Sequence, residues 1–178
     1  TMGGNAEGLS EGGAGRARVL IFVIVGSQKF PFERLIREMD RLKEVGAIQD
    51  EVVAQIGTCP YEPRFMRWQR FMDKETFDRH IAECDLLVTH AGEGSIMTGL
   101  LKGRRVIAVP RYARLGEHVS DHQLEIARAL ARQGCIVNVE DIAELGEAIA
   151  TIDSRALKPY ESGNDAIIRR LCAFIGDA

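Results

Sequence analysis

The sequence has no excess of basic residues, no long apolar run and no closely paired cysteines, and each absence excludes a class of protein. Its formal net charge of -3 at pH 7 provides no basic surface, so we expect no nucleic-acid partner. The longest apolar run, Val19 to Val25, is strand-sized, well short of the roughly 20 residues of a membrane span. Any membrane contact is therefore expected to come through another protein or a surface contact.

The cysteines are widely spaced and form no Cys-x-x-Cys pair, which favours reduced thiols in a cytoplasmic protein. Cys84, Cys135 and Cys172 each stand among apolar neighbours, where a small buried thiol fits well. Cys59 lies in a Gly-Thr-Cys-Pro loop, and we expect it to be the exposed one. No neighbouring residue in the sequence would serve as its base, so a catalytic thiol is disfavoured.

The composition indicates one ordinary folded domain behind a glycine-rich leader. Hydrophobic residues make up 46% and charged residues 28% of the 178 residues, a balance that excludes disorder for most of the chain. Residues 1–18 contain six glycines and no periodic apolar pattern, so we expect a flexible leader. We expect residues 19–178 to form a single domain that ends in an amphipathic helix at 164–175.

Strand-like apolar runs alternate with helical patterns along this domain. The expected strands are 19–25, 51–57, 66–71, 86–88, 105–110 and 135–139. The expected helices begin at Pro31 or Phe32, at Lys74 behind an Asp73 cap, just after Gly94, at Asp121 and at Asp141. This alternation predicts an α/β fold with a doubly wound parallel sheet, which is Rossmann-like.

The most informative stretch is 85–103, where a buried strand ends in a loop of small residues and a helical pattern follows at once. Gly92 and Gly94 allow a ligand close to the backbone, and Ser95 is expected to cap the helix. The free N–H groups at such a helix start favour an anion, so the loop is a candidate cradle for a diphosphate. The alternative is a tight strand-to-helix turn that binds nothing.

Unusual polar residues gather in the loops that follow the predicted strands, which in a parallel sheet share one edge. They are Ser27, Gln28, His90, Glu93, Ser95, Arg111, Glu117, His118, Asp121, His122 and Gln123. A dinucleotide oxidoreductase would instead need Gly-x-Gly-x-x-Gly after the first strand and an acidic residue after the second. The loop from Gly26 to Pro31 and the Gln55 to Thr58 segment meet neither requirement.

His118 and His122 stand four residues apart, a spacing that can chelate zinc on a helix. No third ligand has a matching spacing, so we expect no metal. We expect Asp121 to cap the next helix, while Glu117, His118 and Gln123 offer hydrogen bonds to a polar ligand such as a sugar. The alternative is a solvated loop with one cap.

Four strings in this order resemble one known family. They are Val25-Gly-Ser-Gln-Lys-Phe-Pro-Phe32, Gln55-Ile-Gly-Thr58, His90-Ala-Gly-Glu-Gly-Ser-Ile96, and Pro110-Arg111 followed by Gly116-Glu-His-x-x-Asp-His-Gln123. Together they resemble the carboxyl-terminal domain of glycosyltransferase family 28, over residues 19 to about 152. Within that family the strings are most similar to catalytic subunits of bacterial two-subunit enzymes of capsule and exopolysaccharide assembly, of the glucuronosyl- or galactosyltransferase type.

The resemblance implies the donor half of a GT-B enzyme, which binds a UDP-sugar and uses neither a metal nor another cofactor. The implied UDP-sugar site consists of Gly26, Ser27, Gln28, Phe71, Met72, His90, Gly92, Glu93, Gly94, Ser95, Ile96, Arg111, Asp121, His122 and Gln123. Glu117 and His118 are implied as the catalytic residues at the donor sugar. One departure is Thr98, which stands where other members carry a Glu for the ribose hydroxyls, so ribose recognition must differ here.

The resemblance also implies inverting transfer with a second protein. The acceptor half that would supply the general base is missing, so we expect a membrane-anchored acceptor-binding subunit that presents a lipid-linked sugar. The chain would then act in the cytoplasm, at the inner face of the membrane through its partner. Phe30, Phe32 and Trp68 are candidates for the partner contact, with core packing as the alternative.

The expected donor sugar is glucuronate, because Arg111 and Lys29 could pair with its carboxylate. Galactose, glucose and N-acetylglucosamine stay open as donors. An N-acetylglucosaminyltransferase subunit of the same fold and a non-catalytic nucleotide-binding regulatory module are the alternative functions.

Overall fold

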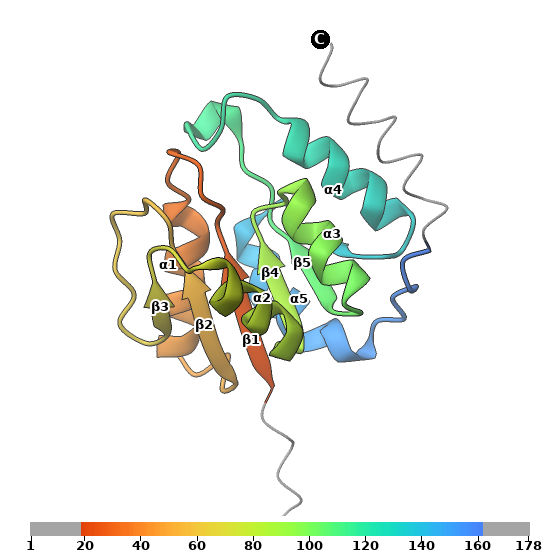
Figure 1. Ribbon diagram of the computed structural model, residues 1–178, viewed down its shortest axis with the longest axis horizontal. Coiled ribbons are helices and arrows are strands. Elements are labelled where there is room, and N and C mark those ends of the chain that lie inside the picture. Colours follow the sequence, from red (N-terminus) through yellow and green to blue (C-terminus); the bar gives the residue numbers. More distant parts are fainter. Residues whose placement is uncertain (1–18, 162–178) are drawn as a thin grey trace, which may run out of the picture.

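The computed structural model describes residues 19–161, so the predicted leader 1–18, Cys172 and the predicted helix 164–175 lie outside the described residues. A six-stranded, fully parallel sheet has the order β3-β2-β1-β4-β5-β6 (Figure 1). The strands are β1 Leu20–Ile24, β2 Glu51–Gln55, β3 Arg67–Gln69, β4 Leu86–Thr89, β5 Arg105–Ala108 and β6 Val137–Asn138. The predicted doubly wound α/β fold is confirmed.

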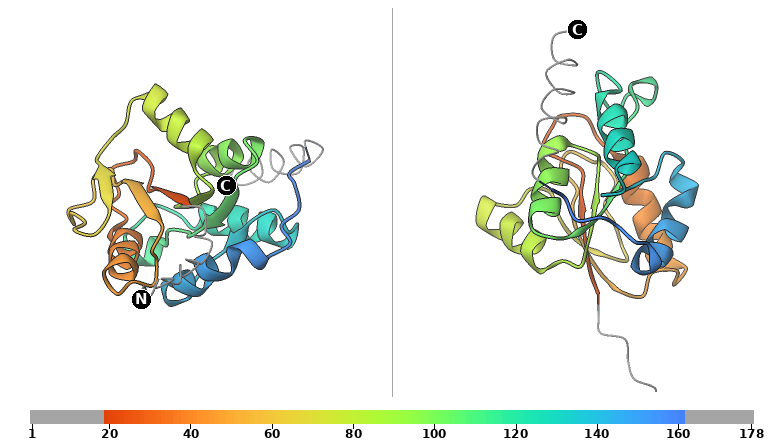
Figure 2. Two further views of the ribbon diagram at one scale, coloured as in Figure 1. Left: turned by 90° about the horizontal axis from the view of Figure 1, so that it is seen from below. Right: turned by 90° about the vertical axis from the view of Figure 1, so that its right-hand side faces the viewer.

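Helices cover both faces of the sheet (Figure 2). They are α1 Glu33–Glu44, α2 Lys74–Glu83, α3 Glu93–Leu101, α4 His122–Arg132 and α5 Leu145–Thr151. The apolar sides of α1 and α5 pack into one core, and those of α2, α3 and α4 pack into a second core on the opposite face. The sheet is thus the middle layer of three.

The central strand β1 explains why its sequence is apolar at every position. Ile21 and Val23 join the core beneath α1 and α5, whereas Phe22 and Ile24 join the core beneath α2 and α3. A strand buried on both faces has no polar side, so its sequence is a continuous run rather than an alternation.

The strand order creates the crevice in which this fold binds ligands. After β1 the chain continues outward through β2 and β3, and it then returns to place β4 on the other side of β1. Ile24 is in register with Thr89, and Thr89 is in register with Ala108, so three adjacent strands end together. Ligands in such sheets lie outside these carboxyl ends, at the point where the strand order reverses.

Three predictions of helix caps have different outcomes. Asp73 caps α2 as predicted, because its carboxylate accepts the Thr76 N–H at 2.8 Å. The prediction for Ser95 is wrong, since α3 has already begun at Glu93, with Gly92 in the cap position. Asp121 does hold the cap position of α4, yet its side chain accepts the Ala113 N–H at 2.9 Å and makes no bond to the helix.

Two further expectations differ from the structure. Cys59 is fully buried rather than exposed, and burial raises the pKa of its thiol. The predicted helix 141–152 is broken into a 3-10 turn at Ile142–Glu144, the short helix α5 and a second 3-10 turn at Ile152–Ser154. Among the described residues, no helix combines the length and the apolar character needed to cross a membrane.

Candidate functional site

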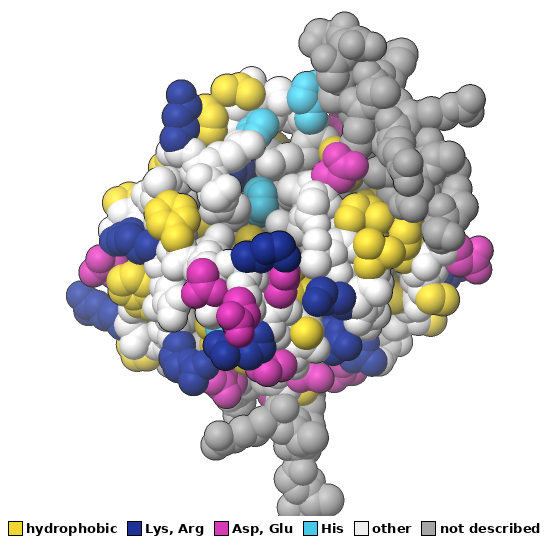
Figure 3. Space-filling model, in the orientation of Figure 1, with side chains coloured by type: hydrophobic (Ala, Val, Ile, Leu, Met, Phe, Trp, Pro, Cys, Tyr) yellow, Lys and Arg dark blue, Asp and Glu magenta, His cyan; other side chains and the backbone are white. Residues whose placement is uncertain are grey.

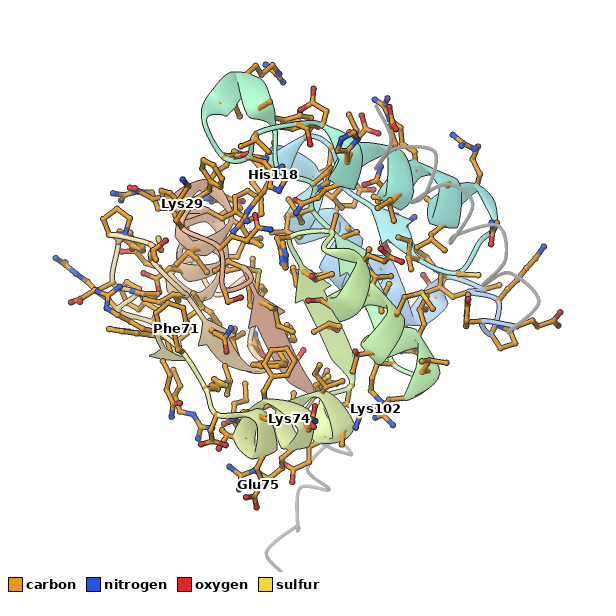
Figure 4. The ribbon with its side chains drawn as sticks, turned by 45° about the horizontal axis from the view of Figure 1, so that its top comes forward. Lys29, Phe71, Lys74, Glu75, Lys102 and His118 are labelled. Carbon is orange, nitrogen blue, oxygen red and sulfur yellow. The ribbon has the colours of Figure 1, made fainter. Side chains whose placement is uncertain are left out.

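The candidate site is the edge of the sheet at which β1, β4 and β5 end, and the polar loops predicted from the sequence follow these strands. Histidine side chains gather in the upper part of the face drawn in Figure 3. Lys29 and His118 lie at this edge, and Phe71 lies on its β2 side (Figure 4).

His90 lies at the centre of this edge, between two glycines. A Cβ atom on Gly26 would stand 2.8 Å from His90 Nε2, and a Cβ atom on Gly92 would stand 2.4 Å from it. Both distances are shorter than van der Waals contact, so the imidazole fits only because neither neighbour has a side chain. The first loop and the β4–α3 loop therefore approach each other through this ring.

The His90 ring is neutral at physiological pH. Burial, with a further contribution from the positive charge of Arg111, lowers its pKa to about 4. Nδ1 stands 3.3 Å from the Ile24 carbonyl, which can only accept, so the proton is on Nδ1. Nε2, on the side of the two glycines, is then free to accept a hydrogen bond.

The start of α3 presents its first-turn amides without a capping side chain. Gly92 holds the cap position, and the N–H groups of Glu93, Gly94 and Ser95 belong to the first turn, where an α-helix has no internal acceptors. Ala91 enters the turn with φ 66°, a left-handed conformation that is strained for a residue with a side chain. Such strain is frequent in ligand-binding turns.

Gly94 has no structural reason to be a glycine. Its φ is not positive, and a Cβ atom built on it would meet nothing within 4 Å. An alanine would also favour the helix by about 1 kcal/mol. A missing side chain in open space at a helix N-terminus is what a closely approaching ligand requires.

Arg111, predicted to contact a phosphate or a sugar carboxylate, is engaged elsewhere. Its side chain is fully buried, and Nη2 donates to the Val25 carbonyl and, at 3.2 Å, to the Phe30 carbonyl. Burial lowers the pKa of the guanidinium to about 10, and the carboxylate of Glu117 acts in the opposite direction. Arg111 therefore supports the first loop from behind, and its ligand-contacting role stays a prediction.

Glu117, implied as catalytic, is also buried, and both of its oxygens are bonded. Arg34 donates from Nε to Oε1 at 2.9 Å and from Nη2 to Oε2 at 3.0 Å, and the Tyr112 N–H donates to Oε2 at 3.0 Å. Arg34 Nη2 also donates to the Pro110 carbonyl at 3.0 Å. The geometry thus makes Glu117 an anchor of the β5–α4 loop, and its catalytic role stays a prediction.

The remaining residues of this loop are more open to a ligand. His118 packs its ring 5.9 Å from that of Phe30. Asp121 is exposed, and His122 is half-buried at the first position of α4. Gln123 is 8% exposed, and its Oε1 has no partner among the described residues. A buried amide oxygen without a donor is costly, so Gln123 is suited to accept a hydrogen bond from a ligand.

The β2 side of the site is formed by Phe71 and Met72. Phe71 is 53% exposed, so its ring offers an aromatic surface for stacking with a nucleobase. The Met72 N–H donates to Gln55 Oε1 at 3.1 Å and is therefore already occupied. Sequence reasoning missed the roles of Gln55 and Arg34, although a glutamine at the end of an apolar strand run is visible in the sequence.

The three aromatic candidates for partner contact divide by burial. Phe32 is fully buried in the core beneath α1, and Trp68 packs partly against that core and donates from Nε1 to the Pro63 carbonyl at 3.0 Å. Phe30 is half-buried beside His118. Within residues 19–161, no group of three or more His, Cys, Asp or Glu side chains could hold a metal ion.

Comparison with known proteins decides the family. The family described as "Glycosyltransferase family 28 C-terminal domain" matches residues 20–171. The chain belongs to glycosyltransferase family 28. The family resemblance predicted from the four strings is therefore confirmed, and the chain is a glycosyltransferase domain.

Two curated relatives of this family 28 domain carry the name "UDP-N-acetylglucosamine transferase subunit ALG13". The Homo sapiens protein is 27% identical over 121 residues, which cover 64% of this chain, and the Mus musculus protein is 28% identical over 90 residues, which cover 48%. The matched parts are 10% and 7% of the two relatives, so the chain spans only a small fraction of their length.

Solved structures share the fold of this family 28 domain. An NMR structure of ALG13 superposes with TM-score 0.58 at 17% identity, covering 86% of this chain and 94% of that chain. A MurG crystal structure from Acinetobacter baumannii gives 0.54 at 17%, covering 80% of this chain and 44% of that chain. The glycosyltransferase of kitacinnamycin gives 0.58 at 20%, covering 92% and 40%. The chain thus has the Rossmann-like fold of one part of these GT-B enzymes.

Proposed function

We propose that this domain is the donor-binding subunit of an inverting glycosyltransferase and holds the diphosphate of a UDP-sugar at the N-terminus of α3. The observation that carries the proposal is Gly94, a glycine that faces open space among uncapped amides. Backbone N–H groups of Glu93, Gly94 and Ser95 would donate to the phosphate oxygens, which the positive end of the helix dipole also favours, whereas the Ile96 N–H already donates to the Gly92 carbonyl at 3.0 Å. Glu93 would take part through its backbone, since its side chain is exposed.

The other walls of the site would orient the nucleotide. Ser27 and Gln28 are exposed on the first loop, next to Gly26 and His90, and would contact the nucleotide from there. His90 would accept a hydrogen bond through Nε2, since a neutral imidazole offers one acceptor. The exposed ring of Phe71 would stack against uracil, with Met72 beside it.

The sugar would lie toward the β5–α4 loop. His118, Asp121, His122 and Gln123 are the polar groups of this loop that Arg34 does not occupy. Sugar hydroxyls can donate to the unpaired Oε1 of Gln123 and can exchange hydrogen bonds with the other three side chains.

In the reaction, an acceptor hydroxyl attacks the anomeric carbon while the bond from that carbon to the UDP oxygen breaks. The departing diphosphate gains negative charge, and the amides of α3 stabilise it. A general base must take the hydroxyl proton. We assign that base to a partner subunit, as the family resemblance of the four strings implies.

The partner is proposed to be a membrane-anchored subunit that presents a lipid-linked sugar, which would place this domain at the inner face of the membrane. The word "subunit" in the relatives' name supports an assembly of this kind. A role in exopolysaccharide or capsule assembly rests on the resemblance of the four strings alone.

For the donor sugar, we favour N-acetylglucosamine over glucuronate. The relatives' name specifies UDP-N-acetylglucosamine. Glucuronate was expected on the basis of Arg111 and Lys29, but Arg111 is fully buried and bonded to two backbone carbonyls. An uncharged sugar needs no cation at this place.

A thermal-shift panel tests the proposal with the purified chain. UDP and UDP-N-acetylglucosamine at millimolar concentration are expected to raise the melting temperature, because a ligand that binds only the folded state stabilises it. NAD and inorganic phosphate are the controls and should have little effect. Absence of any shift with UDP and all UDP-sugars would contradict the proposal, whereas binding without transfer by the assembled complex would favour the regulatory module.

A further inference from the structure

One side chain from the loop after β5 binds both ends of the first loop of the site. Arg111 follows β5, and its Nη2 donates both to the Val25 carbonyl and, at 3.2 Å, to the Phe30 carbonyl. These two carbonyls bracket the exposed turn from Ser27 to Lys29. A single guanidinium NH₂ group therefore fastens the two ends of the turn together.

The turn has little else to hold it. The described residues from Gly26 to Phe30 adopt neither helix nor strand. Apart from Arg111, the one hydrogen bond that they receive from the described part of the chain comes from Thr58 Oγ1 to the Lys29 carbonyl at 3.3 Å. Gly26 has a φ of 79°, a left-handed conformation that residues with a side chain rarely adopt.

Burying the Arg111 guanidinium costs desolvation free energy. Its side chain is fully buried, and Nε and Nη1 have no hydrogen-bond partner within residues 19–161. The ring of Phe32 lies 5.4 Å from its guanidinium carbon. Glu117 supplies the nearest opposite charge, but Arg34 and Tyr112 occupy its oxygens. An apolar side chain of similar volume would avoid this desolvation cost, so packing alone does not explain an arginine here.

We infer that Arg111 is a positioning residue for donor binding, which sets the Ser27–Lys29 turn at a fixed place opposite the start of α3. This inference rests on the proposed function, in which that turn faces the diphosphate. Arg111 acts through the loop and does not touch the donor. Without this fastening the turn populates several conformations, and the affinity for the donor falls in proportion to the fraction that stays competent.

Backbone amide order parameters, measured by NMR on the chain without ligand, test the fastening directly. In Arg111→Met, the order parameters of Ser27 to Phe30 are expected to fall below the wild-type values, while those of α3 stay unchanged. Arg111→Lys should restore part of the order, since an ammonium also donates to carbonyls. Arg128→Met is the matched control, because Arg128 pairs with Glu140 at the surface.

Donor affinity supplies the second readout. The Kd for UDP is expected to rise about 10-fold in Arg111→Met, as for a competent fraction near one tenth, and to change little in Arg128→Met. Wild-type order parameters in the turn together with weakened binding would overturn the inference in favour of direct ligand contact. Unchanged affinity would also overturn it, leaving Arg111 a structural residue.

The two proposals fail in different ways. If the wild-type chain does not bind UDP or any UDP-sugar, the proposed function fails while the order parameters still test the fastening. If the wild type binds and Arg111→Met matches it in both readouts, only the inference fails. Should Arg111→Met not fold, the same comparison is made with Arg111→Lys, where wild-type order parameters in the turn would overturn the inference.

Discussion

At the scale of single residues, buried polar groups shape the site. His90 fills the gap between Gly26 and Gly92, and Glu117 ties the β5–α4 loop to Arg34. The sequence identified both residues as unusual, because polar side chains followed predicted strands. Their contacts in the folded chain were not predictable, since partners such as Arg34, which binds Glu117, stand 83 residues away in the sequence.

The buried His90 makes folding depend on pH. Its pKa of about 4 in the folded protein lies below the value near 6.5 of an unfolded chain, so the unfolded state takes up the proton first as the pH falls. The associated stability is complete above pH 6.5 and is lost toward pH 4, by about 3 kcal/mol at most. Urea unfolding from pH 7 to pH 4.5 should show a smaller loss in His90→Gln than in the wild type.

His122→Gln is the control for that series and should lose stability with falling pH as the wild type does. Parallel curves for the wild type and His90→Gln would contradict the assignment of a neutral, buried ring.

A substitution at Glu117 can distinguish a structural anchor from a catalytic residue. Glu117→Gln removes the charge that faces Arg34 and is expected to lower the free energy of unfolding by about 2 kcal/mol, because the Arg34 charge loses its partner. Glu62→Gln, at the exposed pair with Arg70, should cause no measurable loss. Full stability of Glu117→Gln with abolished transfer by the assembled complex would instead support the catalytic role.

At the scale of elements, the sequence predicted the strands and most helices well because both faces of the sheet are buried and each helix has one apolar side. The exact first residue of each helix was harder to predict. Ser95 has the right chemistry for a cap, but Gly92, three residues earlier, holds the cap position and α3 begins at Glu93. The helix predicted at 141–152 fails since 3-10 turns replace its ends.

Helix α3 is held close to the sheet by a glycine in its second half. A Cβ atom on Gly99 would stand 2.7 Å from Leu87 Cδ2 and 3.1 Å from Val106 Cγ2. Gly99→Ala is therefore expected to lower the free energy of unfolding by about 1 to 2 kcal/mol, since the overpacking exceeds the gain in helix propensity. Gly94→Ala, on the same helix in open space, should show no loss in the same urea titration. Equal stability of the two variants would contradict this packing.

At the scale of the whole molecule, the family followed from four short strings and the fold from the alternation of strands and helices. The glucuronate prediction used Arg111 as a ligand cation, whereas the structure buries Arg111 and bonds it to backbone carbonyls, so the donor stays a prediction. In the proposed function the acceptor half comes from a second protein, and no pattern within one chain describes the surface of another.

The central claim is that α3 begins at a diphosphate site, and UDP binding to Gly94 variants measured by isothermal titration calorimetry tests it most directly. Wild-type protein is expected to bind UDP, and Gly94→Val should weaken that binding at least about 10-fold, as the loss of a charge-assisted hydrogen bond would, with an unchanged melting temperature without ligand. Ala82→Val, on the exposed side of α2, should bind UDP as the wild type does. Equal affinity of Gly94→Val and wild type would contradict the account.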